Sequence, residues 1–412
     1  MVARCTSPAD VVHALNFVRQ HNVPFSLRGG GHNIAGNAVC DEGVMIDLSP
    51  MKKVDIDQQH HQGHVEPGCT LAEFDTAAQA YGLATPLGIN STTGVAGLTL
   101  GGGFGWLSRK YGLTVDNLLG VDIVTADGQQ LHASESENAD LFWGLRGGGG
   151  NFGIVTRFTF QLHPVGPNVL CGLIVFPFEQ AKSVITQFDR FTETMPDELN
   201  VWMVTRKAPP LPFLPEEVHG KEIVAFALCY AGDPAEGEKL IEPLRGFGTA
   251  YGEHIGVQPY TDWQQAFDPL LTPGARNYWK SHNFLTLDEG VIDTIIDYAS
   301  TLPSPQCEIF IATLGGQASR VDPQAMAYSS RDANYVLNVH ARWETAADDA
   351  RCITWARDFF ARSQPFASGG AYVNFLTEDE TDRTAFAYGA SYERLVAIKK
   401  QYDPENLFRI NQ

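Results

Sequence analysis

Apolar residues in the first part of the chain alternate between helical and strand-like spacing. Val11, Leu15 and Val18 recur on one helical face, and the preceding Ser7 and Pro8 are typical of an N-cap and a first helical residue. The predicted elements here are a helix ending near His21-Asn22, strands over 23–27 and 43–48, and a helix over 70–81 that stops at Gly82.

A hairpin follows, and longer strands separated by helices begin at about residue 169. Asp127-Gly128 stands between two apolar runs, which is a strong hairpin signal, and residues 154–162 alternate apolar with polar residues. Further strands are predicted over 169–176, 201–205, 223–230, 309–314 and 335–343. Helices are predicted over 179–194, 234–245, 288–301, 346–362 and 384–401.

The strand over 335–343 indicates how the later part of the chain is layered. Tyr335, Leu337, Val339, Ala341 and Trp343 share one face, so we expect helices to cover one side of an antiparallel sheet. With 412 residues, the chain is long enough for two or three domains. The pattern predicts an α+β fold.

The composition is that of a globular protein in which acidic residues outnumber basic ones. Hydrophobic residues make up 44% of the chain, charged residues 19%, and the formal net charge is −19. Such a charge argues against nucleic acid or an anionic membrane as a partner. No apolar run reaches membrane-spanning length, and residues 1–30 lack the apolar centre of a signal peptide. We expect a cytoplasmic monomer or homodimer that acts on a small molecule, with secretion left open because Met1 need not be the natural start.

The cysteines and a histidine cluster favour neither zinc nor disulfide chemistry. The seven cysteines are scattered and form no C-x-x-C pair, so reduced thiols are expected. His60, His61 and His64 match no metal-ligand spacing, and a solvated turn is their expected role. We therefore predict no metal site.

Three glycine-rich loops, 29–31, 101–105 and 147–150, stand out. Consecutive glycines turn without a Cβ penalty and bring successive N–H groups close to an anion, and His32 adds an imidazole at the edge of the first loop. One such loop is equally well a tight turn, but three favour a bound nucleotide. Gly148, Gly150 and Gly153 satisfy G-x-G-x-x-G, yet a strand is predicted after them where a dinucleotide fingerprint needs a helix.

Several motifs are similar to those of one family when taken together. They are Leu27–Asn33, Ser91–Leu107, Lys110–Leu113, Asp116-Asn117, Asp140–Trp143, Arg146–Gly153, Tyr372–Phe375 and Tyr402–Phe408. Over nearly its whole length the chain resembles the berberine-bridge-enzyme-like FAD-linked oxidoreductases of the vanillyl-alcohol-oxidase and p-cresol-methylhydroxylase (PCMH) superfamily. The resemblance implies a PCMH-type FAD-binding domain over 1–165, an inserted substrate domain of antiparallel sheet plus helices over 166–365, and a segment over 366–412 that returns to the FAD domain.

The resemblance also implies the cofactor contacts. His32 matches the histidine bonded to the flavin 8α-methyl carbon, a bond that a neutral imidazole can form; a solvent-exposed loop histidine is the alternative. The residues implied to bind FAD are Arg28, Gly29, Gly30, Gly31, His32, Asn33, Thr92, Gly94, Gly97, Gly101, Gly102, Gly103, Gly105, Gly153, Ile154, Val155, Tyr372 and Asn374.

Asn90 and Thr93 stand at positions that concern how the flavin is attached and reoxidised. Many relatives add a second bond from the cysteine of a C-P-x-x-G stretch, and the matching residues here are Asn90–Gly94. Asparagine cannot form a thioether, so we expect a single covalent link, through His32. Thr93 falls where relatives place a residue that gates oxygen, which leaves O₂ and another acceptor both open.

Tyr372 and Asn374 are the implied catalytic residues. Oxidising an alcohol requires a group that takes the hydroxyl proton while hydride leaves carbon for flavin N5, and Tyr372 matches the family's active-site tyrosine. Its ordinary pKa of roughly 10 requires a cationic or hydrogen-bonding neighbour, which Asn374, Lys280 or Arg331 could supply. A buried packing tyrosine, and surface or interdomain pairing of the two cations, are the alternatives.

We therefore expect an FAD-dependent enzyme that oxidises a CH–OH group of a sugar, an oligosaccharide or a secondary metabolite. The alternatives are a flavin-containing or degenerate binding protein for an aromatic small molecule, and an enzyme with non-covalent FAD. Relatives carry several tens of residues before the segment that starts here at Met1. The chain therefore resembles a form shortened at its N-terminus, in which full FAD retention stays open.

Overall fold

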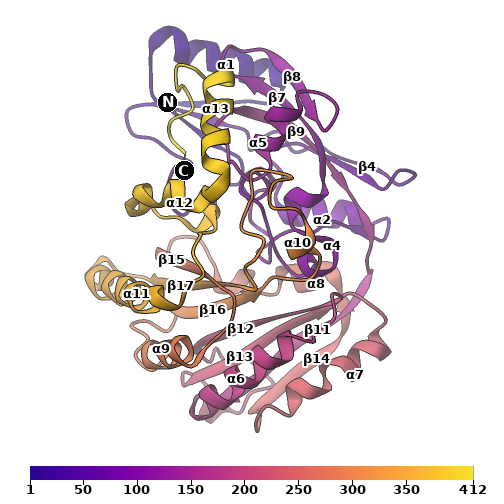
Figure 1. Cartoon of the computed structure of the whole chain (residues 1–412), viewed down its shortest axis with the longest axis vertical. Helices are drawn as coiled ribbons and strands as arrows, with labels where there is room; N and C mark the ends of the chain where they lie inside the picture. The colour runs from indigo at the N-terminus through magenta and orange to yellow at the C-terminus, as the bar shows by residue number, and fades with distance from the viewer. Residues whose placement is uncertain (412) are drawn as a thin grey trace.

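The computed structural model describes residues 1–411 and arranges them as an upper part built from both ends of the chain and a lower part built from its middle (Figure 1). A parallel sheet of order β1-β3-β2 starts the upper part. Its strands are β1 (Val2–Arg4), β2 (Phe25–Arg28) and β3 (Val44–Asp47), with α1 (Pro8–His21) between the first two. As predicted, Ser7 Oγ accepts from the Asp10 N–H at 3.3 Å and Asn22 closes the helix in the left-handed region, at φ 48°.

An antiparallel sheet of order β4-β5-β9-β7-β8 completes the upper part. Its strands are β4 (Val54–Asp57), β5 (Gln62–Val65), β7 (Leu118–Thr125), β8 (Gln130–Ser134) and β9 (Gly153–Gln161). The β7–β8 hairpin turns at Gly128, where φ is +86°, as Asp127-Gly128 predicts. Strand β9 begins at Gly153, so the G-x-G-x-x-G stretch leads into a strand, also as predicted.

Short elements connect these strands and hold the glycine loops. They are α2 (Leu71–Gln79), β6 (Leu83–Ala84), α3 (Val95–Leu100), α4 (Ser108–Tyr111), α5 (Ala139–Leu145) and β10 (His163–Pro164), which pairs with β6. Thr70 and Glu73 form a reciprocal capping box at the start of α2, which explains why this predicted helix begins there.

The lower part is one antiparallel sheet of order β14-β11-β13-β12-β16-β17-β15. Its strands are β11 (Asn168–Pro177), β12 (Leu199–Lys207), β13 (Glu222–Tyr230), β14 (Gly252–Pro259), β15 (Arg276–Phe284), β16 (Glu308–Thr313) and β17 (Tyr335–Trp343). The predicted helices are α6 (Ala181–Thr192), α7 (Pro234–Arg245), α9 (Glu289–Ala299) and α11 (Asp349–Ser363). Residues of all four helices pack in one buried cluster with side chains from one face of the sheet, which confirms the one-sided layering; Figure 1 shows α6 and α9 on the side away from the upper part.

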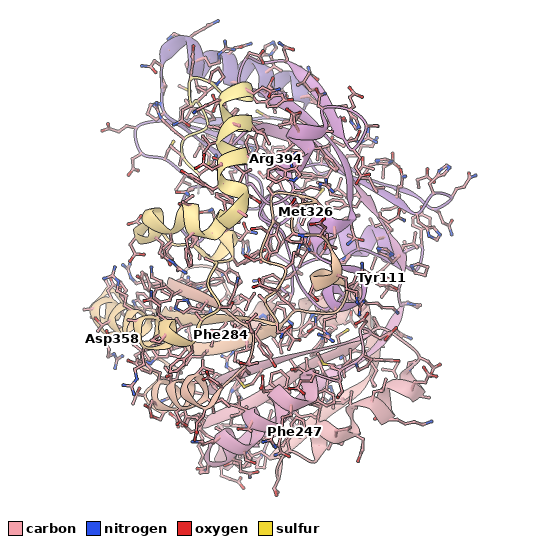
Figure 2. The ribbon with its side chains drawn as sticks, viewed as in Figure 1. Tyr111, Phe247, Phe284, Met326, Asp358 and Arg394 are labelled. Carbon is pink, nitrogen blue, oxygen red and sulfur yellow. The ribbon has the colours of Figure 1, made fainter. Side chains whose placement is uncertain are left out.

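Alternation along the strands divides side chains between two environments. Phe284 and Leu337 pack with the helices in the largest buried cluster, and Figure 2 shows Phe284 at the sheet and Phe247 in the helical layer. Residues of opposite parity, such as Trp202 and Phe310, face the upper part in a separate aromatic cluster. The smaller helices α8 (Tyr260–Gln265) and α10 (Gln317–Arg320) fill the junction.

The last segment departs from prediction. One helix was expected over 384–401, but α12 (Thr384–Tyr388) ends at Gly389 and α13 (Tyr392–Tyr402) restarts after a 3₁₀ turn. The prediction is wrong because Gly389 has φ +50°, which a continuing helix cannot accommodate. Leu395 of α13 packs in the core of the upper part, so the C-terminus returns to the N-terminal layers, and Figure 2 places Arg394 there.

Strands β1, β4, β5, β6, β10, β14 and β15 were not predicted. His64, expected in a solvated turn, instead lies in β5, with its Nδ1 3.0 Å from the Thr159 hydroxyl oxygen. Strand β14 is an edge strand whose residues are mostly exposed, and β15 (RNYWKSHNF) carries polar residues on both faces, so neither has the apolar alternation of a half-buried strand. Among the helices of residues 1–411, none is long and apolar enough to cross a membrane.

Candidate functional site

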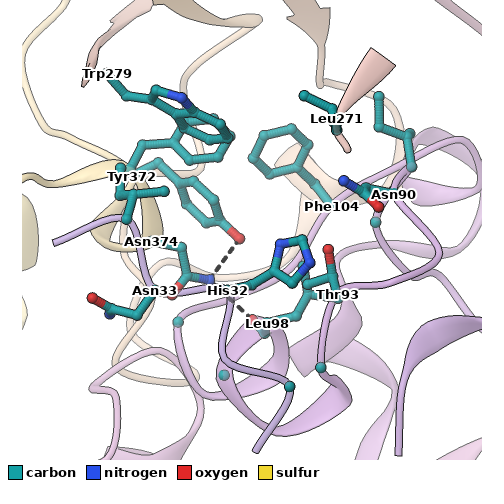
Figure 3. Close-up of a pocket in the computed structure, with 18 of the residues that line it drawn as sticks. His32, Asn33, Asn90, Thr93, Leu98, Phe104, Leu271, Trp279, Tyr372 and Asn374 are labelled. Atoms are coloured by element: carbon teal, nitrogen blue, oxygen red, sulfur yellow. Dashed lines mark hydrogen bonds between the residues drawn. The ribbon is translucent and has the colours of Figure 1, made fainter. Parts of the chain in front are cut away.

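A cavity of about 560 Å³ runs from the glycine loops of the upper part to the upward face of the seven-stranded sheet. Its volume lies within the usual range of small-molecule sites. Leu48, Ile154 and Ile410 line one end, and Trp202, Phe310 and Trp279 line the other. Figure 3 shows the side chains of His32, Phe104 and Tyr372 around a common space, with Trp279 beside Tyr372.

The first glycine loop follows β2 directly and meets the loop before α3. A Cβ added to Gly94 would lie 2.5 Å from the Gly30 nitrogen, and one added to Gly30 would overlap the Gly94 backbone. A Cβ on Gly29 would lie 2.8 Å from the Pro67 carbonyl oxygen. Because the backbones touch here, only glycine fits at these positions.

His32 stands at the edge of this loop with its ring toward the cavity (Figure 3). Its Nε2 lies 2.9 Å from the Thr92 hydroxyl oxygen. Solvent reaches the His32 side chain, as in the alternative of an exposed loop histidine. The protein packed around one side of the ring still lowers the pKa of His32, an effect that the Asp268 carboxylate opposes. This direction favours the neutral imidazole, the form that a nucleophilic nitrogen requires.

The lower part of the molecule clamps the loop that carries Thr92. Asp268 accepts from the Ser91 backbone N–H at 3.0 Å and from the Ser91 hydroxyl at 2.5 Å. The Asn90 side-chain oxygen accepts from the backbone N–H and the hydroxyl of Thr92. The backbone and two side chains of this loop are thus fixed beside His32.

Tyr372 lies at the boundary between the two ends of the cavity. Its oxygen receives the Gly103 N–H at 3.0 Å and the Asn374 Nδ2 at 2.9 Å, and the latter nitrogen also donates to the Leu98 carbonyl. Burial raises the pKa of Tyr372 to about 12, although both donors act to lower it. The hydrogen-bonding neighbours expected from the sequence are therefore present.

The second glycine loop, residues 101–105, packs around Tyr372 and Asn374. A Cβ added to Gly101 would overlap the Asn374 side chain, and one added to Gly102 would lie 2.8 Å from the Tyr328 ring. A Cβ added to Gly105 would overlap the Leu87 carbonyl. These glycines therefore let the loop pass close to Tyr372 and Asn374.

Lys280 and Arg331, the candidate cations, form other ion pairs. Lys280 Nζ lies 2.7 Å from Asp379 and 3.1 Å from Glu380. Arg331 meets Asp116 at 2.6 Å. These ion pairs join strands or loops of the lower part to other segments, so they favour the interdomain role over a direct effect on Tyr372.

Aromatic rings and one polar cluster form the sheet end of the cavity. Trp202 stacks on Phe310 with ring centroids 5.9 Å apart. Beyond them, Arg206 pairs with Glu308 at 2.8 Å, and His340 lies 3.4 Å from the same carboxylate. Burial acts to raise the pKa of Glu308, but Arg206 and His340 bring it below its ordinary value. The sequence analysis missed this cluster because its members come from three strands.

Most of the predicted site residues line the cavity. They are Gly29, Gly30, Gly31, His32, Asn33, Gly94, Gly97, Gly101, Gly153, Ile154, Val155, Tyr372 and Asn374. Outside the lining are Arg28, Thr92, Gly102, Gly103 and Gly105, of which Thr92 contacts His32 and Gly103 contacts Tyr372. Lining residues that the sequence analysis missed include Asn37, Leu48, Asn151 and Asn411.

The arrangement suits an elongated anionic cofactor. Glycine backbones border the cavity where added side chains would collide, and such backbones can approach a diphosphate. Apolar residues at the far end, Leu48 and Ile154, suit an aromatic base. Among the residues whose side chains the structure describes, no group of three or more His, Cys, Asp or Glu could hold a metal ion, and His60 pairs with Asp57 at 2.6 Å.

Comparison with curated proteins gives full-length relatives. An FAD-linked oxidoreductase of Dictyostelium discoideum is 32% identical over 407 residues, covering 98% of this chain and 85% of the relative. The (R)-6-hydroxynicotine oxidase of Paenarthrobacter nicotinovorans is 30% identical over 425 residues, covering 100% of this chain and 90% of the relative.

Solved structures have the same fold. The 6-hydroxy-D-nicotine oxidase of Arthrobacter nicotinovorans superimposes with a TM-score of 0.88 at 27% identity, covering 100% of this chain and 90% of that one. A xylooligosaccharide oxidase of Myceliophthora thermophila gives 0.86 at 24% identity, covering 99% and 89%, which supports the fold alone. Family models match residues 1–134 as an FAD binding domain and residues 371–412 as berberine and berberine-like. The chain belongs to the berberine-bridge-enzyme-like family of FAD-linked oxidoreductases.

Proposed function

We propose that this FAD-linked oxidoreductase oxidises the CH–OH carbon of a small, largely apolar molecule and holds its FAD by a single covalent bond from His32. The bound flavin supplies the hydride acceptor, at its N5 atom. The observation that carries the proposal is the position of Tyr372, whose hydroxyl lies between the glycine loops and the aromatic end of the cavity.

Tyr372 is the group proposed to take the substrate hydroxyl proton. The Gly103 N–H and Asn374 Nδ2 both donate to its oxygen, so two fixed dipoles stabilise negative charge there. Neither donor is charged, and burial keeps the pKa of Tyr372 at about 12. The phenolate form is therefore scarce at neutral pH, and proton removal becomes easier as pH rises.

The cavity wall favours one of the expected substrate classes. On the sheet, Leu173, Val175, Val204 and Ala225 extend the apolar surface around the aromatic rings, whereas a sugar requires many hydrogen-bonding side chains around its hydroxyls. The ionisable side chains on this sheet face of the cavity are Arg206, Glu308 and His340. We therefore favour a ring-bearing secondary metabolite with one polar end over a sugar or an oligosaccharide.

Oxidation of a carbon bonded to nitrogen is the second candidate. It is favoured by the relative that is named an (R)-6-hydroxynicotine oxidase and is 30% identical over the full chain. The Glu308 carboxylate on the cavity wall could accept hydrogen bonds from an amine. A protein that binds an aromatic small molecule without converting it is the non-enzymatic alternative.

Anaerobic mixing of the yellow protein with matched alcohols and amines tests the proposal. We expect apolar ring-bearing alcohols to bleach the flavin absorbance, and air to restore it. Bleaching by amines alone would favour the second candidate, and ligand binding without bleaching would favour the binding protein. Flavin that stays with acid-precipitated protein would support the covalent bond, and its release would contradict that part of the proposal.

A further inference from the structure

Asn90, Thr92 and His32 form a chain of hydrogen bonds at the edge of the cavity. The Asn90 side-chain oxygen lies 3.2 Å from the Thr92 backbone nitrogen and 2.8 Å from the Thr92 hydroxyl oxygen. The same hydroxyl oxygen lies 2.9 Å from Nε2 of His32. One side chain thus links the loop backbone to the imidazole.

The backbone contact fixes the direction of every bond in this chain. A backbone N–H can only donate, so the Asn90 atom that receives it is the amide oxygen and not the nitrogen. That oxygen can only accept, so the single hydroxyl hydrogen of Thr92 points to Asn90. The Thr92 oxygen is left as an acceptor, and Nε2 of His32 must carry the hydrogen that it receives.

We infer that Asn90 and Thr92 are positioning residues for flavin attachment, which hold His32 as the Nε2–H tautomer with the Nδ1 lone pair free to attack. The inference rests on the covalent link of the proposed function. Among the described residues, no hydrogen bond involves Nδ1, since the bond of His32 is made by Nε2. Because Asp268 clamps Ser91, the loop cannot easily rotate Thr92 away.

The attachment step balances without any further group of the protein. A bond forms between Nδ1 and the 8α carbon of the flavin, that carbon loses one hydrogen as a proton, and the imidazole loses the Nε2 proton to solvent. The flavin ring system is the oxidant: it gains two electrons and takes up two protons. Dioxygen then removes both electrons and both protons as hydrogen peroxide.

Thr92→Val and Thr92→Ser are the matched test variants, because valine keeps the shape and loses the hydroxyl while serine keeps the hydroxyl. Full-length apoprotein from riboflavin-starved cells is mixed with FAD, and intact mass follows the covalent fraction with time. We expect valine to slow attachment about tenfold to a hundredfold, by analogy with residues that orient metal-bound histidines, and serine to change it less than about threefold. Flavin fluorescence measures non-covalent FAD binding in each variant, so that attachment rates are compared at equal occupancy of the site by FAD.

Nitrogen NMR of ¹⁵N-histidine-labelled apoprotein provides a second readout that slow attachment alone would not change. The His32 signal, identified from its loss in His32→Ala, should report the Nε2–H tautomer in the wild type and a mixture in Thr92→Val. Asn90→Ala frees the Thr92 hydroxyl to rotate, so it should give the same mixture even if Thr92→Val fails to fold.

Two results would overturn the inference, and they differ. Equal attachment rates in Thr92→Val and Thr92→Ser, or an unchanged tautomer in Asn90→Ala, would remove the positioning role while leaving the covalent link intact. Wild-type protein that binds FAD but never gains its mass would refute the covalent link, and the positioning role with it.

Discussion

Gly30 and Gly94 lie back to back, with the backbone of the His32 loop against the backbone that starts α3. A Cβ on Gly94 would be 2.5 Å from the Gly30 nitrogen, a distance at which one loop must move. Both residues line the cavity. The contact therefore sets how far the His32 loop stands from the loop of Asn90 and Thr93.

We expect Gly94→Ala to weaken both FAD retention and stability. Backbone cannot yield as a flexible side chain does, so the methyl group should cost about 1–3 kcal/mol or more and displace His32 from its place. Thermal unfolding and the flavin content of the purified protein measure the two effects. Gly256→Ala is the control, because its Cβ would meet nothing within 4 Å; equal behaviour of the two variants would contradict the prediction.

Tyr372→Phe should slow flavin reduction while leaving the cofactor in place. The change removes the oxygen that accepts from Gly103 and Asn374, and the loss of a general base costs about a hundredfold or more. Stopped-flow absorbance under nitrogen measures the reduction rate, and the oxidised spectrum reports the flavin surround. A rate equal to that of the wild type would remove Tyr372 from the mechanism.

The same role predicts a steep pH dependence. Because burial raises the pKa of Tyr372 to about 12, the phenolate fraction increases about tenfold per pH unit below that value. The reduction rate of the wild type should therefore rise with pH between roughly 6 and 9 without a plateau. Tyr372→Phe should lose the slope, and a flat wild-type profile would indicate that Tyr372 orients the substrate instead of deprotonating it.

His32→Ala should keep part of its flavin under native conditions and release all of it in acid. The glycine backbones and the apolar residues at the far end of the cavity are unchanged in this variant, so part of the FAD should still bind. Gel filtration in neutral buffer, followed by acid precipitation, separates the two populations. Yellow precipitate from the variant would mean that another residue carries the bond.

The parts of the fold that follow from local rules were accessible from the sequence. Ser7 caps the start of α1 and Asn22 caps its end. Asp127-Gly128 forms the turn of the β7–β8 hairpin, as the dipeptide predicts. The glycine loops indicated a ligand because consecutive glycines allow tight turns and a close approach of the backbone to a bound group. Each of these signals lies within about ten residues of its effect.

The rest depends on contacts between distant segments. Glu308 acquires its neighbours only when β12, β16 and β17 align, since Arg206 and His340 lie on the strands either side of it. Lys280 was a candidate for the active site, yet the returning segment brings Asp379 and Glu380 to it. Gly389 ends α12 within a stretch whose apolar spacing favoured a continuous helix. Periodicity carries no information about such partners.

Asp75 should make the protein less stable as pH rises. It is buried between α2 and α8, where Gln264 Nε2 donates to it at 2.9 Å. Burial raises the pKa of Asp75 to about 7 in the folded protein, so between roughly pH 4 and 7 the folded state keeps a proton that the unfolded state has lost. The free energy of unfolding should fall by about 1.4 kcal/mol per pH unit in that range and level off above it. Urea unfolding from pH 4.5 to 8.5 measures the slope.

Asp75→Asn separates this contribution from those of other titrating groups. The amide keeps an oxygen for Gln264 and carries no charge at any of these pH values, so it should remove the slope and stabilise the protein at pH 8 by a few kcal/mol. Asp262→Asn, an exposed change on the same helix as Gln264, should leave the slope as it is. Parallel stability curves for the wild type and Asp75→Asn would mean that Asp75 is already ionised in the folded protein, with its charge solvated despite its burial.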